Sequence, residues 1–241
     1  MAFDPSKYKV STSERYMPVV LLLDVSGSMD GDKIDNLYDA TVKMIETFTD
    51  EGKKEIPYKI AIITFGASVE YHTPYTDATK NFAQNLKPFV ADGMTPLGTA
   101  LRMAKDIIED KDETPKRWYR PAVVLVSDGM PTDSYQGPLQ DFISNGRTAR
   151  CQRLSMGIGS DPRFIDYNVL RNFAGEDSEK ITGTDKLCFK AEDAADIVKV
   201  FKLISSSISQ TASSNKNSFP NVPPPSSKKK SVGNTDEEDF L

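Results

Sequence analysis

Apolar runs that do not alternate with polar residues recur along the chain, and segments with one apolar face separate them. Unbroken runs of this length are typical of strands that are covered on both faces. Such strands are predicted at residues 19–23, 58–65, 121–126 and 151–158. Apolar residues at three- and four-residue steps predict amphipathic helices. These are expected at residues 33–52, 97–108, 136–149, 161–173 and 192–208.

The alternation of strands and helices predicts an α/β fold: a doubly wound, mostly parallel sheet with helices on both faces. Residues 69–72 are expected to form a short antiparallel edge strand, residues 77–86 show a weak helical pattern, and residues 180–189 contain strand material. The expected division is an arm at 1–15, one domain at 16–210 and a disordered tail at 211–241. The tail has too few apolar residues to bury a core.

The overall composition excludes several function classes. Of the 241 residues 27% are charged, and the formal net charge is −5. A mildly acidic chain is not suited to coat nucleic acid or anionic membrane. No apolar run approaches the ~20 residues that cross a bilayer, and the N-terminus has no secretory pattern. We therefore expect a cytoplasmic protein in which Cys151 and Cys188 are reduced, with a disulfide as the alternative.

Small polar residues follow the first apolar run directly. Asp24, Ser26 and Ser28 occupy every second position after residues 19–23. Open α/β sheets bind ligands beyond the carboxyl ends of their strands, so these side chains are expected at a binding crevice. One carboxylate and two hydroxyls provide only oxygen ligands. Oxygen ligands suit a small hard cation such as Mg²⁺.

Two further segments are expected to reach the same edge of the sheet. Thr95 lies in the loop at 93–96, and Asp128 follows the strand at 121–126. The three motifs DVSGS (24–28), GMTPL (93–97) and VSDG (126–129) occur in that order. Together they resemble the von Willebrand factor A (vWA) domain and its metal-ion-dependent adhesion site (MIDAS). The resemblance covers roughly residues 16–210, and the loop looks most like that of stand-alone bacterial TerY-type proteins.

The resemblance implies a non-catalytic module for protein–protein interaction. Ser26, Ser28 and Thr95 would donate hydroxyl oxygens to Mg²⁺ (or Mn²⁺), and Asp24 and Asp128 would hold the ion mostly through water. An acidic residue of a protein partner would complete the coordination, with neither nucleic acid nor membrane involved. TerY-type relatives imply a scaffold in a bacterial stress or tellurium-resistance complex with kinase or phosphatase partners. An adaptor for a MoxR-type AAA+ ATPase is the alternative.

Three residues near the motifs are expected to form the rim around the ion. For the two methionines among them, ordinary packing is the alternative. These are Met29, Met94 and Pro131. The acidic end at 236–241 offers a further hypothesis, in which the tail supplies its own carboxylate to the ion.

Simpler interpretations of the same residues remain open. Asp24, the serines and Asp128 are common in turns, and Thr95 before Pro96 fits a helix cap followed by proline at the first helical position. A hydrolase would need Ser26 as nucleophile and the single histidine, His72, as base, but the sequence around Ser26 is not a GxSxG elbow. A metal-dependent phosphohydrolase is the remaining enzyme alternative. The glycine motifs of nucleotide-binding enzymes are incomplete.

Overall fold

The computed structural model describes residues 15–52, 56–159, 161, 163–175 and 187–215. Within these residues the chain forms a six-stranded sheet in the order β3-β2-β1-β4-β5-β6. The strands are β1 (Met17–Asp24), β2 (Tyr58–Phe65), β3 (Val69–Asp77), β4 (Ala122–Ser127), β5 (Gln152–Ile158) and β6 (Cys188–Ala191). Only the β2–β3 pair is antiparallel. The predicted fold class is therefore confirmed.

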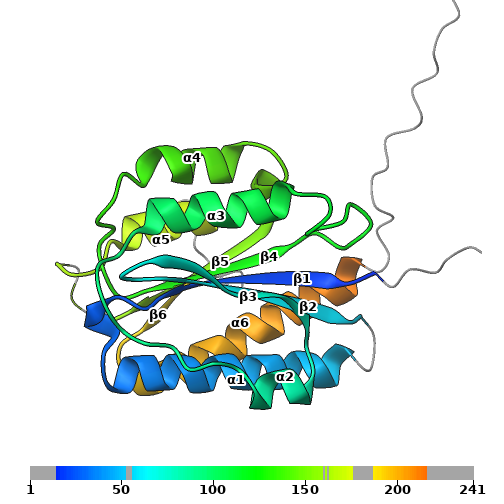
Figure 1. Ribbon diagram of the computed structural model, residues 1–241, viewed down its shortest axis with the longest axis horizontal. Helices are drawn as coiled ribbons and strands as arrows, with labels where there is room; N and C mark the ends of the chain where they lie inside the picture. The colour runs from blue at the N-terminus through cyan, green and yellow to red at the C-terminus, as the bar shows by residue number, and fades with distance from the viewer. Residues whose placement is uncertain (1–14, 53–55, 160, 162, 176–186, 216–241) are drawn as a thin grey trace, which may run out of the picture.

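Helices cover both faces of the sheet. The α-helices are α1 (Asp32–Gly52), α2 (Lys80–Gln84), α3 (Leu97–Glu109), α4 (Gln136–Ser144), α5 (Tyr167–Ala174) and α6 (Ala194–Asn215). Figure 1 shows α3, α4 and α5 on one face and α1, α2 and α6 on the other. Two short 3₁₀ turns, η2 (Gly27–Met29) and η3 (Thr148–Arg150), complete the described elements.

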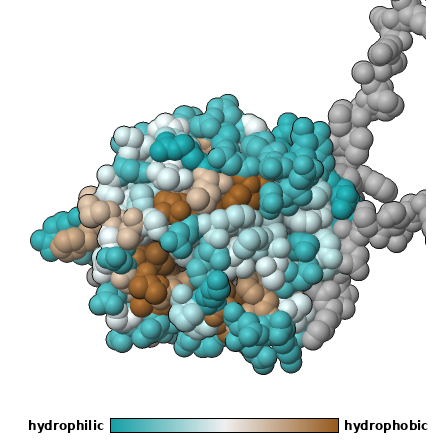
Figure 2. Space-filling view, viewed as in Figure 1, coloured by the Kyte–Doolittle hydropathy of each residue, from teal (hydrophilic) through white to brown (hydrophobic). Residues whose placement is uncertain are grey.

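The central strand β1 explains why the apolar run does not alternate. All eight of its residues are buried. Val19, Leu21 and Leu23 pack in the core cluster with α1 and α6, whereas Val20 and Leu22 pack in the cluster with α3 and α5. Each face of the strand thus needs apolar side chains, because each face is covered. On the face shown in Figure 2, separate apolar patches lie among polar side chains.

Several boundaries differ from the expected ones for local reasons. The predicted edge strand at 69–72 continues to Asp77, and an edge strand tolerates the proline at position 74. The predicted helix at 136–149 stops at Ser144, because Gly146 has a φ of +69° and redirects the chain into η3. The weak pattern at 77–86 forms a helix only over α2.

The last two predicted helices also have different limits. The helix predicted at 161–173 begins at Tyr167, where the Asp166 side chain accepts hydrogen bonds from two backbone N–H groups of the first turn. Helix α6 continues beyond 208, because Ile208 and Ala212 still pack in the core. The acidic end at 236–241 and most of residues 180–189 lie outside the described residues.

Cys151 and Cys188, both within the described residues, are buried and form no disulfide. In the described part of the chain, no helix has the length and apolar character needed to cross a membrane.

Candidate metal centre

The site begins where two neighbouring parallel strands end. Asp24 is the last residue of β1, and Asp128 directly follows β4. Because β1 and β4 are paired in parallel, their carboxyl ends lie side by side. The Asp24 carboxylate accepts a hydrogen bond from Ser127 Oγ at 2.5 Å and one from the Ser26 backbone N–H at 2.9 Å. Both aspartates are buried, with exposed fractions of 0% and 4%.

The two serines connect these strand ends. Ser26 Oγ lies 3.1 Å from Ser28 Oγ, and Ser28 Oγ donates to Asp128 Oδ1 at 2.7 Å. The 3₁₀ turn η2 positions this segment, since the Met29 N–H donates to the Ser26 carbonyl at 2.9 Å. Asp24, Ser26 and Ser28 therefore reach Asp128 from a distance of about one hundred residues in the sequence.

Thr95 comes to the same place on the loop before α3. The Gly27 N–H donates to the Gly93 carbonyl at 3.0 Å, and this bond fixes the loop against the β1 exit. Thr95 N–H donates to Thr132 Oγ1 at 3.0 Å on the other side. A side chain added at Gly129 would lie 3.1 Å from Thr95 Oγ1 and 4.0 Å from Ser28 Oγ. The hydroxyl of Thr95 is thus beside those of the serines and the Asp128 segment.

These five side chains, which we call the oxygen cluster, are brought together as the sequence predicts: Asp24, Ser26, Ser28, Thr95 and Asp128. Nowhere in the described residues do three His, Cys, Asp or Glu side chains gather in a way that could hold a metal ion. A metal bound here would therefore depend on hydroxyl oxygens and two carboxylates. This donor set fits a hard divalent cation that keeps part of its water shell.

The comparisons with known proteins agree with this architecture. Residues 19–130 match the family model described as von Willebrand factor type A domain. A von Willebrand factor type A structure from Catenulispora acidiphila has a TM-score of 0.56, with 24% identity over 81% of this chain and 43% of that chain. The described residues have the fold of a vWA domain.

Two further relatives extend this comparison. Proximal thread matrix protein 1 from the mussel byssus, in a structure with a zinc-occupied MIDAS motif, has a TM-score of 0.59 and 17% identity over 80% of this chain and 48% of that one. Inter-alpha-trypsin inhibitor heavy chain H3 from Bos taurus is 27% identical over 167 residues. That match includes 66% of this chain but spans only 18% of the bovine protein's length.

A lysine lies directly at the oxygen cluster of this vWA fold. Lys33 Nζ, from the first turn of α1, lies 2.6 Å from Asp128 Oδ2 and donates to the Ser28 carbonyl at 3.0 Å. Its side chain is 36% exposed, whereas that of Asp128 is fully buried. The ammonium group places a positive charge beside the buried Asp128 carboxylate. Lys33 was not among the residues expected at the site, although its position one turn after DVSGSM is a signal in the sequence.

Burial and charge act together on the Asp24 carboxyl. The pKa of this carboxyl is raised from 3.8 to about 6, mainly by burial. Hydrogen bonds from Ser127 and Ser26 oppose the rise, and the negative charge of Asp128 contributes to it. Two buried carboxylates in proximity repel each other, and a positive charge between them relieves that repulsion. The electrostatics of the oxygen cluster therefore favour a positive charge beside these two carboxylates.

The alternative in which Thr95 caps α3 is wrong. Pro96 takes the capping position, and among the described residues no side chain at that position bonds to the first turn of α3. Asp133 provides the acceptors instead, at 2.8 Å from the Gly98 N–H and 2.9 Å from the Thr99 N–H. A residue far along the chain thus satisfies the helix start, and the Thr95 hydroxyl is free for the oxygen cluster.

The rim around the cluster differs partly from the expected one. Met29 is fully buried in the core, so it cannot contribute to the rim. Met94 is 64% exposed and lines a cavity of about 390 Å³ above the cluster. Pro131 is half-buried and is not among the residues that line this cavity. Met130 and Phe164, which the sequence analysis missed, are the other exposed apolar residues there.

The hydrolase alternative finds no support in the geometry. His72 Nδ1 lies 2.9 Å from Thr73 Oγ1, and within the described residues no hydrogen bond joins His72 to Ser26. The nearest partner of Ser26 Oγ is another hydroxyl, which is a poor general base.

Proposed function

We propose that this vWA domain is a non-catalytic, metal-dependent module for protein–protein interaction. The observation that carries the proposal is the oxygen cluster, to which three separate segments of the chain contribute. The zinc-occupied MIDAS motif of the mussel protein supports a divalent ion at the corresponding place in this fold. We propose Mg²⁺, with Mn²⁺ as the alternative, because all the ligands are oxygens.

In this proposal the hydroxyls of Ser26, Ser28 and Thr95 face the ion, and Asp24 and Asp128 hold it from the buried side. Such an ion provides a Lewis-acidic position for one carboxylate from outside. The chain's own residues orient that carboxylate: the backbone bonds of the Gly93 loop fix Thr95, and the exposed side chains of Met94 and Met130 offer apolar contacts beside it. The expected partner therefore presents a Glu or Asp next to apolar residues.

A narrower setting rests on the resemblance of the GMTPL loop to TerY-type proteins. We propose a cytoplasmic scaffold in a bacterial stress or tellurium-resistance complex with a kinase or phosphatase, and an adaptor for a MoxR-type AAA+ ATPase as the second candidate. The genes next to the coding sequence separate the two settings. Nucleic acid and membrane are not expected partners, since the net charge is −5.

Capture of partners from a lysate of the source cells tests the proposal. The immobilised full chain is compared in Mg²⁺ and in EDTA, and the wild type is compared with Asp24→Ala and with the distant surface variant Asp141→Ala. Proteins retained by wild type and Asp141→Ala in Mg²⁺, but lost in EDTA and with Asp24→Ala, support the proposal. An identical set of proteins in all four samples contradicts it.

A further inference from the structure

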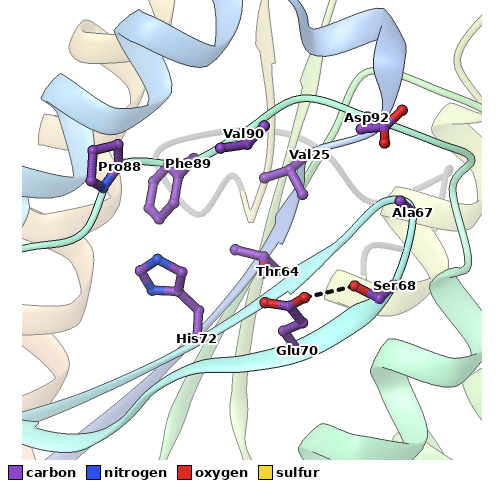
Figure 3. A pocket seen from close by; sticks show the side chains of 10 residues that line it. All are labelled: Val25, Thr64, Ala67, Ser68, Glu70, His72, Pro88, Phe89, Val90 and Asp92. Atoms are coloured by element: carbon purple, nitrogen blue, oxygen red, sulfur yellow. Dashed lines mark hydrogen bonds between the residues drawn. The ribbon is translucent and has the colours of Figure 1, made fainter.

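A second cavity, of about 310 Å³, lies beside the oxygen cluster. The β2–β3 hairpin forms one side and the loop before α3 forms the other (Figure 3). The two sites share the same backbone. Val25, between Asp24 and Ser26, lines the cavity, and Asp92 at its rim is followed by Gly93, which lines the cavity above the metal centre. The Asp92 N–H donates to the Val25 carbonyl at 2.8 Å and joins these two segments.

A threonine hydroxyl opens into the cavity at its base. Thr64 is only 6% exposed, and its side chain takes part in none of the hydrogen bonds among the described residues. Figure 3 shows Thr64 between Val25 and Glu70 at the centre of the cavity. Thr64 and Glu70 are opposite each other in the antiparallel ladder, so their side chains share one face. The Thr64 hydroxyl can therefore bond to a ligand that enters the cavity.

Two carboxylates line the cavity: Glu70 lies next to Thr64, and Asp92 lies at the rim beyond Val25 (Figure 3). Glu70 uses Oε1 to accept from Ser68 Oγ at 2.8 Å, and Asp92 uses Oδ1 to accept from the Gly93 N–H at 2.7 Å. The second carboxylate oxygen of each has no hydrogen bond among the described residues, and neither side chain forms an ion pair there. His72 contributes no permanent positive charge, because burial and the nearby Lys87 lower its pKa. The cavity thus offers acceptors for a cationic donor.

The opposite wall is apolar. Phe89 is buried and stacks edge-on to His72, with 5.2 Å between the ring centroids. Val90 is 75% exposed at the mouth, and Val25 lies behind it. A ligand that suits the whole cavity therefore has an aliphatic stem and a cationic head with several N–H donors. An arginine side chain has this form, since its planar guanidinium carries five donors and its stem packs on apolar surface.

We propose that this cavity binds an arginine side chain of a protein partner, with the guanidinium on Glu70 and Thr64 and the stem on Phe89 and Val90. Asp92 at the rim adds a second negative charge. In a partner that also completes the metal centre, the arginine would lie close to the acidic residue that binds the ion. Only this placement rests on the proposed function. The arginine subsite itself needs no metal, because none of its residues belongs to the oxygen cluster.

Fragment binding to the full chain tests the subsite directly. The probe is N-acetyl-L-arginine N-methylamide, followed by ¹H–¹⁵N correlation NMR in EDTA and again in Mg²⁺. The matched control probe is the citrulline analogue, which has the same shape without the charge; the lysine analogue tests the preference for guanidinium. We expect saturable shifts at residues 64–72 and 88–92 with the arginine probe in both buffers, much weaker shifts with lysine and none with citrulline.

Variants localise the binding. Glu70→Gln and Thr64→Val, which keep side-chain volume, should each weaken arginine binding by about three- to tenfold. Asp77→Asn, at the far end of β3, should leave it unchanged. Equal binding of citrulline, shifts confined to other residues, or wild-type affinity in both Glu70→Gln and Thr64→Val would overturn the proposal. A Mg²⁺ titration of the same samples shows separately whether the metal centre fails, so the two proposals are tested independently.

Discussion

Asp24 makes the stability of the metal-free protein depend on pH in an unusual direction. Its folded-state pKa is about 6, compared with 3.8 for a free carboxyl, because burial disfavours the charged form. A raised pKa means that the folded state binds the proton more tightly than the unfolded state. The resulting stabilisation is fully present below about pH 4 and is lost as the pH rises through 6.

The size of the effect follows from the two pKa values. At about 1.4 kcal/mol per pH unit, the difference between 3.8 and about 6 corresponds to roughly 3 kcal/mol. Asp24→Asn removes the ionisable group and keeps the shape. In EDTA the variant should match wild type near pH 3 and exceed its free energy of unfolding by up to about 3 kcal/mol at pH 8.

Urea denaturation across this pH range, with circular dichroism as the signal, measures the difference. The surface variant Asp141→Asn is the control, since hydrogen bonds from Lys105 and Asn145 lower the pKa of that carboxyl and the sign is opposite. Mg²⁺ should remove much of the advantage of Asp24→Asn at pH 8, because a bound cation stabilises the ionised carboxylate of the wild type. A difference between wild type and Asp24→Asn that does not change with pH in EDTA would refute this reasoning.

Three further variants test how the site is built. Lys33→Met removes the positive charge beside Asp128. Mg²⁺ binding in calorimetry should therefore tighten by about fivefold, equivalent to about 1 kcal/mol. Weaker binding would contradict this and show that the lysine helps to order the site. Asp133→Ala should lower the free energy of unfolding by about 1 kcal/mol in urea titrations, since it removes the cap of α3; an unchanged value would contradict the cap. Gly93→Ala should destabilise the protein more than Gly31→Ala in the same titrations. Both glycines have a φ of +75°, but an added carbon at Gly93 would lie 2.3 Å from Ala67 Cα, whereas Gly31 faces open space. Equal losses of unfolding free energy in the two variants would contradict this reasoning.

The fold was accessible from the sequence because its strongest signals are local. The unbroken run in β1 is typical of a strand covered on both faces, and its polar continuation places Asp24 at the sheet edge. The parallel pairing of β1 and β4 then brings Asp128 to the same edge. Strand ends in a parallel sheet constrain each other, so three short motifs sufficed to predict the oxygen cluster.

Features that depend on long-range packing were not accessible. A threonine before a proline satisfies the local rule for a cap, but Asp133 from another loop makes the bond. Met29 follows exposed Ser28 in the sequence, yet the 3₁₀ turn directs it into the core. Periodicity gives no sign of Lys33 reaching Asp128, or of Thr64 and Glu70 sharing a cavity, since both depend on how loops and edge strands pack.

Isothermal titration of the full chain with MgCl₂ at pH 7.5 tests the central claim most directly, because it needs no knowledge of the partner. The account predicts one saturable site in the wild type that is lost in Asp24→Ala and strongly weakened in Ser26→Ala and Thr95→Val, while circular dichroism shows that all three variants are folded. Wild type without saturable heat, or variants that bind as tightly as wild type, would contradict a metal centre at the oxygen cluster.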